Sequence, residues 1–441
     1  MSVSRIPKSL AMQERAKRRI PGMSQLLSKR PDMFSLGVWP GYFERAAGTR
    51  VWDLDGNEYL DMSIGGIGAN VLGYADPDVD AAVVEAVRKG SSSSLNCQEE
   101  VLLAERLCEL HPWAEMARFT RSGGEAMTVA VRIARAATGR DAVAFCGYHG
   151  WHDWYLAANL EQDVLDGHLL TGLEPAGVPA GLAGTALPFR FNRLEDLLGI
   201  SDRKQGRLAA IILEPIRNHH PDPGFIRGVR ELADAIGAVL IFDEISAGFR
   251  YATGGSHLAL FPERPDICVL SKGLGNGYPI SAVLGRREVM EAAQGTFISS
   301  TAWTERVGFA AALACMAKHE KIDAPALLHD AGTRVMAGWS RSARQHGLDI
   351  EVGGMPPIAH FTFGHHLRDH LKAYFIQLLL QEGMLASNLF YAMAAHTRED
   401  VDRYLNAVDR AFAALARALE NGNLETLLEG RPSAKGFGRL N

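Results

Sequence analysis

The sequence lacks an excess of charge of either sign. Its 441 residues include 46 Lys and Arg against 51 Asp and Glu, which gives a net charge of −5. Binding to nucleic acid or to an anionic membrane needs a basic field over part of the surface. The one basic run, Arg15 to Arg19, has the pattern of a solvated helix face. We therefore expect neither nucleic acid nor a membrane as a partner.

Cysteines and long apolar runs are also scarce. The five cysteines form no CxxC pair, so they predict neither a zinc ribbon nor a disulfide framework. We expect them to be buried free thiols in a reducing compartment. No apolar run is long enough to cross a bilayer, and the N-terminus has no apolar signal-peptide core. These features favour a cytoplasmic protein. The cysteines are Cys97, Cys108, Cys146, Cys268 and Cys315.

The middle of the chain alternates short apolar runs with helical patterns. Near-continuous apolarity over a few residues is typical of parallel strands that are covered on both faces. The pattern predicts an α/β fold with a mostly parallel sheet. The expected strands are residues 142–146, 209–215, 238–244, 267–272 and 280–285.

The length of the chain predicts more than one domain. We expect residues 66–320 to form a large domain that contains the sheet. Residues 321–441 have helical patterns with a few strand-like runs, which predicts a smaller α+β domain. Residues 1–65 contain a helical segment and the hairpin pattern "DLDGN", and we expect them to join the small domain.

Polar residues follow several of the predicted strands. In an open α/β sheet, ligands bind beyond the carboxyl ends of the strands. These ends carry an acid at Asp243 and a lysine at Lys272, while Glu214 and Tyr148 follow two other strands. A lysine held in apolar surroundings loses its proton easily and becomes a nucleophile toward carbonyl groups.

A glycine pair precedes the helical pattern "EAMTVAVRIARAATG" in the loop "RSGGEA". Free amides at a helix N-terminus are a suitable seat for a phosphate. Taken singly, each feature also has an ordinary explanation as a turn, a cap, a core aromatic or a surface lysine. Pyridoxal 5′-phosphate (PLP) requires all four together, because it needs a lysine, an acid at its ring nitrogen, a phosphate seat and an aromatic surface. Lys272, Asp243, Gly123–Gly124 and Tyr148 supply them.

With these residues in view, the chain resembles the class III (subgroup II) aminotransferases of PLP fold type I. Within them it is most similar to the branch that contains glutamate-1-semialdehyde aminomutase. The resemblance covers most of the chain and follows the family's order of motifs. The motifs are "RSGGEAMTVAVRIARAATGR", "GYHGWHD", "ILEPIRN", "GAVLIFDEISAGFR" and "PDICVLSKGLGNGYPISAVLGRREVM".

The resemblance implies a role for each matching residue. Lys272 would form a Schiff base with the cofactor, and Asp243 would pair with its ring nitrogen. Ile245 and Tyr148 would cover the two faces of the ring. The remaining residues would be the phosphate ligands Ser122, Gly123 and Gly124, the nearby acid Glu214, and Thr301, which would reach the phosphate of a neighbouring subunit. A homodimer with shared active sites follows from that last match.

The leading prediction is an aminotransferase that acts on a small amino acid or amine. A glutamate-1-semialdehyde-type aminomutase, or a PLP lyase or racemase of the same fold, is the alternative. The chain departs from the family at Arg121 and Gly124, where Asn and Thr are usual, and at residues 304–306. Ile67 and Asn388 stand where the aminomutases carry Trp and Glu in the substrate pocket.

An anionic substrate would need a fixed cation. The candidates are Lys29, Arg30, Arg217 and Arg306, and the last two are favoured because they flank predicted site segments. A metal site is not predicted, because His149, His152 and Asp153 have no third ligand at a regular spacing.

Overall fold

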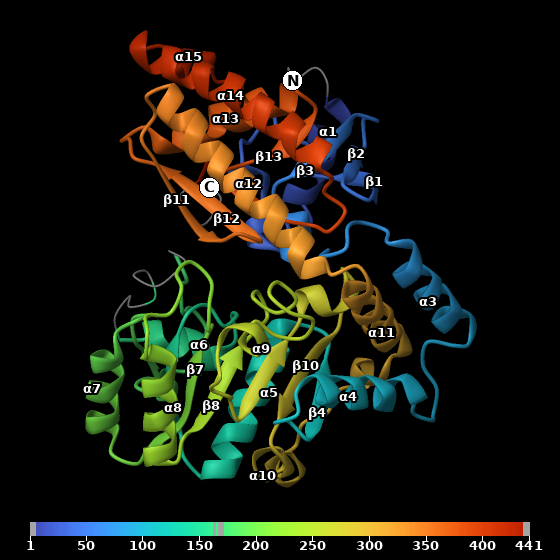
Figure 1. Cartoon of the computed structure of the whole chain (residues 1–441), viewed down its shortest axis with the longest axis vertical. Coiled ribbons are helices and arrows are strands. Elements are labelled where there is room, and N and C mark those ends of the chain that lie inside the picture. The colour runs from blue at the N-terminus through green and yellow to red at the C-terminus, as the bar shows by residue number, and fades with distance from the viewer. Residues whose placement is uncertain (1–5, 162–164, 166–171, 435–441) are drawn as a thin grey trace. The chain divides into compact units, whose positions relative to one another are not determined.

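The computed structural model describes residues 6–161, 165 and 172–434 (Figure 1). The chain forms two compact units. One unit is Pro77–Pro325, and the other combines Met1–Asp76 with Ala326–Asn441. Each unit is described by itself below.

The unit of residues 77–325 is built on a seven-stranded sheet. Its strands pair in parallel, except that β10 runs antiparallel to both of its neighbours. This arrangement confirms the predicted mostly parallel α/β fold. In spatial order the strands are β4 (Met116–Thr120), β10 (Ser281–Gly285), β9 (Ile267–Leu270), β8 (Val239–Asp243), β7 (Leu208–Leu213), β5 (Ala142–Cys146) and β6 (Ala186–Pro188).

Helices cover both faces of this sheet, and this explains why the central strands are almost entirely apolar. Val239 and Ile241 of β8 pack with α5 (Gly123–Thr138), whereas Leu240 and Phe242 pack with α8 (Phe225–Ile236) and α7 (Leu194–Lys204). A strand with alternate residues in two separate cores has no solvent face. The five predicted strands are all present, with ends within two residues of the prediction.

The other helices of this unit are mostly short. The helices are α3 (Pro77–Arg88), α4 (Gln98–Leu110), α6 (Asp153–Leu156), η5 (Ala157–Asn159), η7 (Ala180–Leu182), α9 (His257–Leu260), η8 (Lys272–Gly275), α10 (Arg287–Met290), η9 (Glu291–Gly295), η10 (Thr301–Thr304) and α11 (Arg306–Lys321).

The second unit joins the two ends of the chain through its sheets. The predicted hairpin forms β2 and β3, and β13 from the C-terminal part pairs in parallel with β3. One sheet has the order β1 (Phe43–Ala47), β2 (Arg50–Asp53), β3 (Glu58–Met62), β13 (Met384–Ala386), and the other has the order β11 (Ile350–Met355), β12 (Ile358–Phe363), β14 (Leu389–Tyr391).

The core of this unit is aromatic. The fully buried Trp339, Phe361, Phe375, Tyr404 and Phe412 lie in one cluster. The helices of this unit are α1 (Pro7–Lys17), η2 (Pro21–Met23), η3 (Leu27–Lys29), η4 (Pro31–Met33), α2 (Gly65–Gly68), α12 (Ala324–Gln345), which begins at the unit boundary, α13 (Arg368–Gln381), α14 (Arg398–Glu420) and α15 (Leu424–Leu427).

No helix among the described residues has the length and apolarity needed to span a membrane.

Candidate active site

The carboxyl ends of parallel strands collect the predicted polar residues at one edge of the seven-stranded sheet. β8 ends at Asp243, β7 is followed by Glu214, and β5 is followed by Tyr148. Lys272 comes two residues after β9. Because β5, β7, β8 and β9 are adjacent and parallel, these four residues lie at the same edge.

Lys272 is the first residue of η8, and its backbone has a φ of 44°. A left-handed conformation is uncommon for a residue with a side chain, and such residues cluster at functional sites. Its Nζ donates a hydrogen bond to Ser246 Oγ at 2.7 Å. Burial, together with the positive charge of Arg217, lowers the pKa of Lys272 to about 8. The side chain is therefore an amine that loses its proton near neutral pH.

Asp243 is 2% exposed and is held by two donors. Ile245 N donates to Oδ1 at 2.9 Å, and His149 Nδ1 lies 2.7 Å from Oδ2. His149 Nε2 faces the carbonyl of Cys146 at 3.1 Å, so Nε2 must carry a proton. The 2.7 Å Nδ1–Oδ2 contact is therefore a hydrogen bond that joins the imidazole to the acid. Burial raises the pKa of Asp243, and His149 opposes that rise.

Glu214 forms hydrogen bonds with the loop after β5 and with Arg217. Of the four candidate cations, Arg217 is the one whose charge acts on Lys272. Glu214 accepts from Tyr148 N at 3.1 Å and from Arg217 Nη1 at 2.9 Å. The charge of Glu214 raises the pKa of Lys272, and the charge of Arg217 lowers it more strongly. The Glu214–Arg217 ion pair therefore lies beside the reactive amine.

The other three predicted cations are engaged elsewhere or lie in the other unit. Arg306 Nε lies 3.1 Å from Glu99 Oε2, and its Nη1 donates to carbonyls at the end of α3. Arg30 is 3% exposed and forms an ion pair with Asp32. Lys29 ends η3 in the unit that contains the chain termini. This geometry favours Arg217 over the alternatives.

The predicted phosphate seat is the N-terminus of α5. Ser122 caps this 16-residue helix in a capping box with Glu125. The amides of Gly123 and Gly124 belong to the first turn, where a helix provides no carbonyl partners. A Cβ on Gly123 would lie 2.8 Å from Ile245 Cδ1, so only glycine lets Ile245 pack this closely against the seat.

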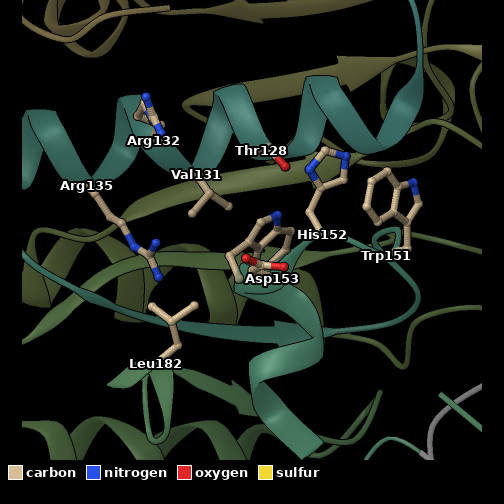
Figure 2. Close-up of a pocket in the computed structure, with 9 residues that line it drawn as sticks. Thr128, Val131, Arg132, Arg135, Trp151, His152, Asp153 and Leu182 are labelled. Atoms are coloured by element: carbon tan, nitrogen blue, oxygen red, sulfur yellow. The ribbon is translucent and has the colours of Figure 1, made fainter. Parts of the chain in front are cut away.

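His152 lies against the same turn (Figure 2). A Cβ on Gly124 would be 3.1 Å from His152 Cδ2 and 3.2 Å from Nε2. The ring therefore occupies the space that a side chain at position 124 would take. A pocket of about 360 Å³ lies beside α5 and is lined by Thr128, Arg132 and Arg135 among others; Figure 2 shows the lining side chains. Of the predicted site residues, none lines this pocket.

Thr301 begins η10, where it is exposed. The backbone after it is held by Arg121, whose Nε donates to the carbonyl of Ala302 at 2.7 Å and whose guanidinium also binds the carbonyl of Glu305. Arg121 directly precedes the phosphate seat. Arg121 thus connects the phosphate seat with the segment that begins at Thr301. The family usually has Asn at this position.

These residues fit PLP. A desolvated amine at Lys272 suits an aldehyde, and a buried acid at Asp243 suits a protonated ring nitrogen. The glycine amides at the start of α5 suit a phosphate, and Ile245 packs directly beside them.

Comparisons with known proteins agree with this fit. The "Aminotransferase class-III" family model matches residues 37–336. The chain is 34% identical to the 2′-deamino-2′-hydroxyneamine transaminase of Streptomyces kanamyceticus, over 84% of this chain and 91% of the relative. It is 30% identical to the 3-aminobutyryl-CoA aminotransferase of Cloacimonas acidaminovorans, over 94% of this chain and 99% of the relative.

Among solved structures, the chain is similar to the FumI protein of Sphingopyxis sp. MTA144 in its PLP internal aldimine form. The TM-score is 0.84 at 27% identity, and the match covers 98% of this chain and 99% of that one. A structure of a transaminase with PLP bound and one of a glutamate-1-semialdehyde aminomutase also share the fold.

The chain therefore belongs to the class III aminotransferase family and has PLP fold type I. It is a PLP-dependent enzyme of the transaminase or aminomutase type. The resemblance stated from the sequence is confirmed.

Sequence reasoning missed three neighbours of the site. His149 was assigned only to a family motif, and its contact with Asp243 requires that β5 and β8 end at the same edge. Ser246 stands three residues after Asp243, but a serine carries no sign that it meets Lys272. His152 could have been suspected, because Gly124 lacks the family's side chain.

Proposed function

We propose that this enzyme is an aminotransferase for a small amine or amino acid that carries an anionic group. The observation that carries the proposal is the position of Arg217, whose charge acts on Lys272 and whose guanidinium is held by Glu214. Arg binds carboxylates and phosphates through paired N–H donors. A cation beside the reacting amine would hold such a substrate in one orientation.

In this proposal each residue has one task. Lys272 holds the cofactor through its amine and, once released, carries a proton at Nζ. Asp243, supported by His149, keeps the ring nitrogen protonated, while Tyr148 and Ile245 cover the ring and exclude water. When bound, PLP supplies the electron sink that labilises the substituents of the substrate's amine-bearing carbon. Ser246 Oγ accepts from Nζ and fixes the direction of the amine before substrate arrives.

A matched substrate pair tests the role of Arg217. We expect wild-type enzyme to prefer 4-aminobutyrate over butylamine, which lacks the carboxylate. Arg217→Met should raise the KM for the acid about 10- to 100-fold, because a hydrogen bond to a charged group contributes about 1.5–3 kcal/mol. The same variant should change the KM for butylamine little. Arg306→Met is the control, because Arg306 contacts Glu99 and the carbonyls of Lys89 and Gly90, whereas Arg217 acts on Lys272.

An unchanged KM for the acid in Arg217→Met would remove Arg217 from substrate binding. The fate of the amino group distinguishes the reaction types in the same assay. Retention of the amino group by the cofactor indicates transfer, and release of ammonia indicates a lyase. A substrate that only rearranges or inverts indicates an aminomutase or a racemase.

We also propose that the active unit is a homodimer in which Thr301 reaches the phosphate of the partner subunit. Large apolar side chains are exposed near this region: Phe297 is 86% exposed, Trp151 69% and Leu95 82%. Exposed apolar groups of this size favour a protein interface. Arg121 fixes the Thr301 segment next to the phosphate seat of its own chain, so the two seats of a dimer would be linked.

Hybrid dimers test this arrangement. A dimer of one Lys272→Ala chain and one Thr301→Ala chain, purified through two different tags, has one intact site if Thr301 acts on the partner. That hybrid should regain about half of the wild-type activity. If Thr301 acts within its own chain, the hybrid has no intact site and keeps about half of the activity of the Thr301→Ala homodimer.

His152 is proposed as a further phosphate ligand, in place of the side chain missing at Gly124. Burial lowers the pKa of His152, so the ring is neutral and can donate from one nitrogen. His152→Ala should weaken PLP binding about tenfold, the loss expected for one hydrogen bond to an anion. Equal PLP affinity in the variant would remove His152 from the seat.

A cytoplasmic location is part of the proposal. All five cysteines are unpaired, and Cys146, Cys268 and Cys315 are buried. Cys97 and Cys108 are only partly buried, contrary to the sequence prediction. Free thiols of both kinds are typical of a reducing compartment.

A further inference from the structure

Away from the predicted cofactor residues, three buried side chains point their ligand atoms at one another. His111 follows α4, His257 begins α9, and Cys268 is the second residue of β9. All three are 0% exposed. One ligand atom from each lies within 4.8 Å of the other two. The residues are far apart in the sequence, so no spacing motif could have predicted the cluster.

Both imidazoles are hydrogen-bonded through Nδ1. His111 Nδ1 lies 2.8 Å from the carbonyl of Leu107, which can only accept, so Nδ1 carries the proton. His257 Nδ1 lies 2.8 Å from Glu244 Oε1, a carboxylate oxygen that already accepts the backbone N–H of the same residue. With Nδ1 engaged in this way, Nε2 is the ring nitrogen of each histidine that is left to bind an ion.

These two Nε2 atoms are buried and have no hydrogen-bond partner among the described residues. An unpartnered buried acceptor is costly, and it calls for an explanation such as an ion or a water. The backbone closes tightly on the same point: a Cβ on Gly254 would lie 2.9 Å from His111 Cε1 and 3.3 Å from its Nε2. The backbone at Gly254 is therefore packed closely against the His111 ring, and a residue larger than glycine does not fit at this position.

The bonding pattern of both rings matches that of metal-binding histidines. Such histidines donate the second ring N–H to a carboxylate or a backbone carbonyl, which fixes the tautomer and the ring orientation. Here Leu107 and Glu244 fill those two roles. Cys268 adds a thiol, which becomes a thiolate on binding a metal.

Charge balance selects the kind of ion. The Cys268 thiolate and the Glu244 carboxylate would together contribute two negative charges, which a divalent cation neutralises in a buried place. Two imidazoles and one thiolate are ligands of the zinc class. With bonds of about 2.0–2.1 Å to nitrogen and 2.3 Å to sulfur, tetrahedral ligand atoms stand about 3.4–3.6 Å apart. The side chains would therefore close by about 1 Å.

We propose that His111, His257 and Cys268 bind one zinc-class divalent ion that joins α4, α9 and β9. The site is structural, because β9 leads to Lys272 and Glu244 directly follows Asp243 at the end of β8. An ion there would fix the two strands that carry the cofactor residues. Since all three ligands are buried, the ion enters while the chain folds.

The test measures metal in the full-length holoenzyme. Wild-type protein is produced in medium supplemented with zinc, washed with a chelator, and analysed by mass spectrometry for metal per chain. We expect about one ion per chain in wild type and a loss of most of it in Cys268→Ala and in His257→Gln. Cys315→Ala is the matched control, since Cys315 is also 0% exposed but its Sγ lies 3.3 Å from the carbonyl of Gly273.

Growth of the producing cells with cobalt provides a second, spectroscopic readout of the bound metal. Wild-type protein should then show a thiolate-to-cobalt charge-transfer band, and Cys315→Ala should keep it. Wild-type protein without bound zinc or cobalt would overturn the proposal and assign a buried water to the two Nε2 atoms. Metal retained in both Cys268→Ala and His257→Gln would also overturn it, since the ion would then be bound elsewhere.

Discussion

Asp243 and Glu244 are adjacent buried acids that each contact a histidine, yet their surroundings differ. Glu244 accepts four hydrogen bonds, from Ser256 N, Ser256 Oγ, His257 N and His257 Nδ1. Asp243 is held by Ile245 N and His149. The pKa of Glu244 is lowered by its donors, whereas burial raises the pKa of Asp243.

The difference shows how one chain gives two neighbouring carboxylates different tasks. A carboxylate has about four acceptor positions, and the donors around Glu244 fill them. That acid stabilises the local structure. Asp243 has acceptor capacity left at the open edge of the sheet, where a protonated ring nitrogen can pair with it. The number of donors, rather than the residue type, distinguishes Asp243, the proposed partner of the ring nitrogen, from Glu244.

The largest effect is expected for Lys272→Ala, which removes the amine that this edge of the sheet positions. Activity should fall by more than about 10⁴-fold, because the variant loses both the covalent hold on the cofactor and the proton carrier. The fall should appear in kcat, measured with saturating PLP and amine donor. Lys372→Ala, in the other unit, is the control and should keep its activity. Activity within tenfold of wild type in Lys272→Ala would contradict the assignment.

Asp243→Asn should have the next largest effect. The variant keeps the shape of the side chain but removes the negative charge that would stabilise the protonated ring nitrogen. It should lower kcat about 10²- to 10³-fold while the protein still binds PLP. Binding is followed by the cofactor's visible absorbance. If Asp243→Asn kept full kcat, Asp243 would be no more catalytic than Glu244, and the comparison would fail.

Glu244→Gln should affect stability rather than chemistry. The side-chain NH₂ group of the variant would face N–H and O–H groups that donate to the carboxylate of Glu244. We therefore expect the free energy of unfolding to fall by about 1–3 kcal/mol. The folded pKa of Glu244 lies below its usual 4.5. Its stabilisation is therefore present above that pH and is lost as the pH falls through the folded pKa. Denaturant unfolding at several pH values should show a weaker acid dependence in the variant. A loss of kcat per bound cofactor without destabilisation would give Glu244 a catalytic task.

The smallest effect is a shift in pH dependence. The pKa of Lys272 is about 8 before cofactor binds, so the rate of PLP uptake by cofactor-free protein should rise with pH and level above about 8. Arg217→Met removes a charge that lowers this pKa, and Glu214→Gln removes one that raises it. The midpoint should move up in the first variant and down in the second, each by less than about one unit. Equal midpoints in wild type and in both variants would show that the Glu214–Arg217 ion pair does not affect the pKa of Lys272.

The sequence predicts the strands and the helix start whose signal lies within a short segment of the chain. The residues of β5, β7, β8, β9 and β10 are nearly all apolar, because each strand is buried on both faces. The position of Lys272, Asp243 and Glu214 at the carboxyl ends of these strands predicts that they share one edge of the sheet. The glycine pair marked the start of α5 because a helix N-terminus needs no side chain to bind an anion.

The rest depends on distances that no pattern encodes. The His149–Asp243 contact joins residues 94 positions apart, and the cluster of His111, His257 and Cys268 joins three segments. The sequence ranks Arg217 and Arg306 equally, and only the structure shows that Arg217 acts on Lys272 while Arg306 contacts Glu99. The assignments of all the site residues to the cofactor, Lys272 and Asp243 included, stay predictions, and so do the domain boundaries.

The central claim is that Lys272 binds the cofactor through its amine. Borohydride reduction of the PLP-loaded enzyme, followed by digestion and peptide mass spectrometry, tests it most directly. We expect the reduced cofactor to be attached to Lys272 and the label to disappear in Lys272→Ala. A label on another lysine, or an enzyme that binds no PLP, would show that Lys272 does not hold the cofactor.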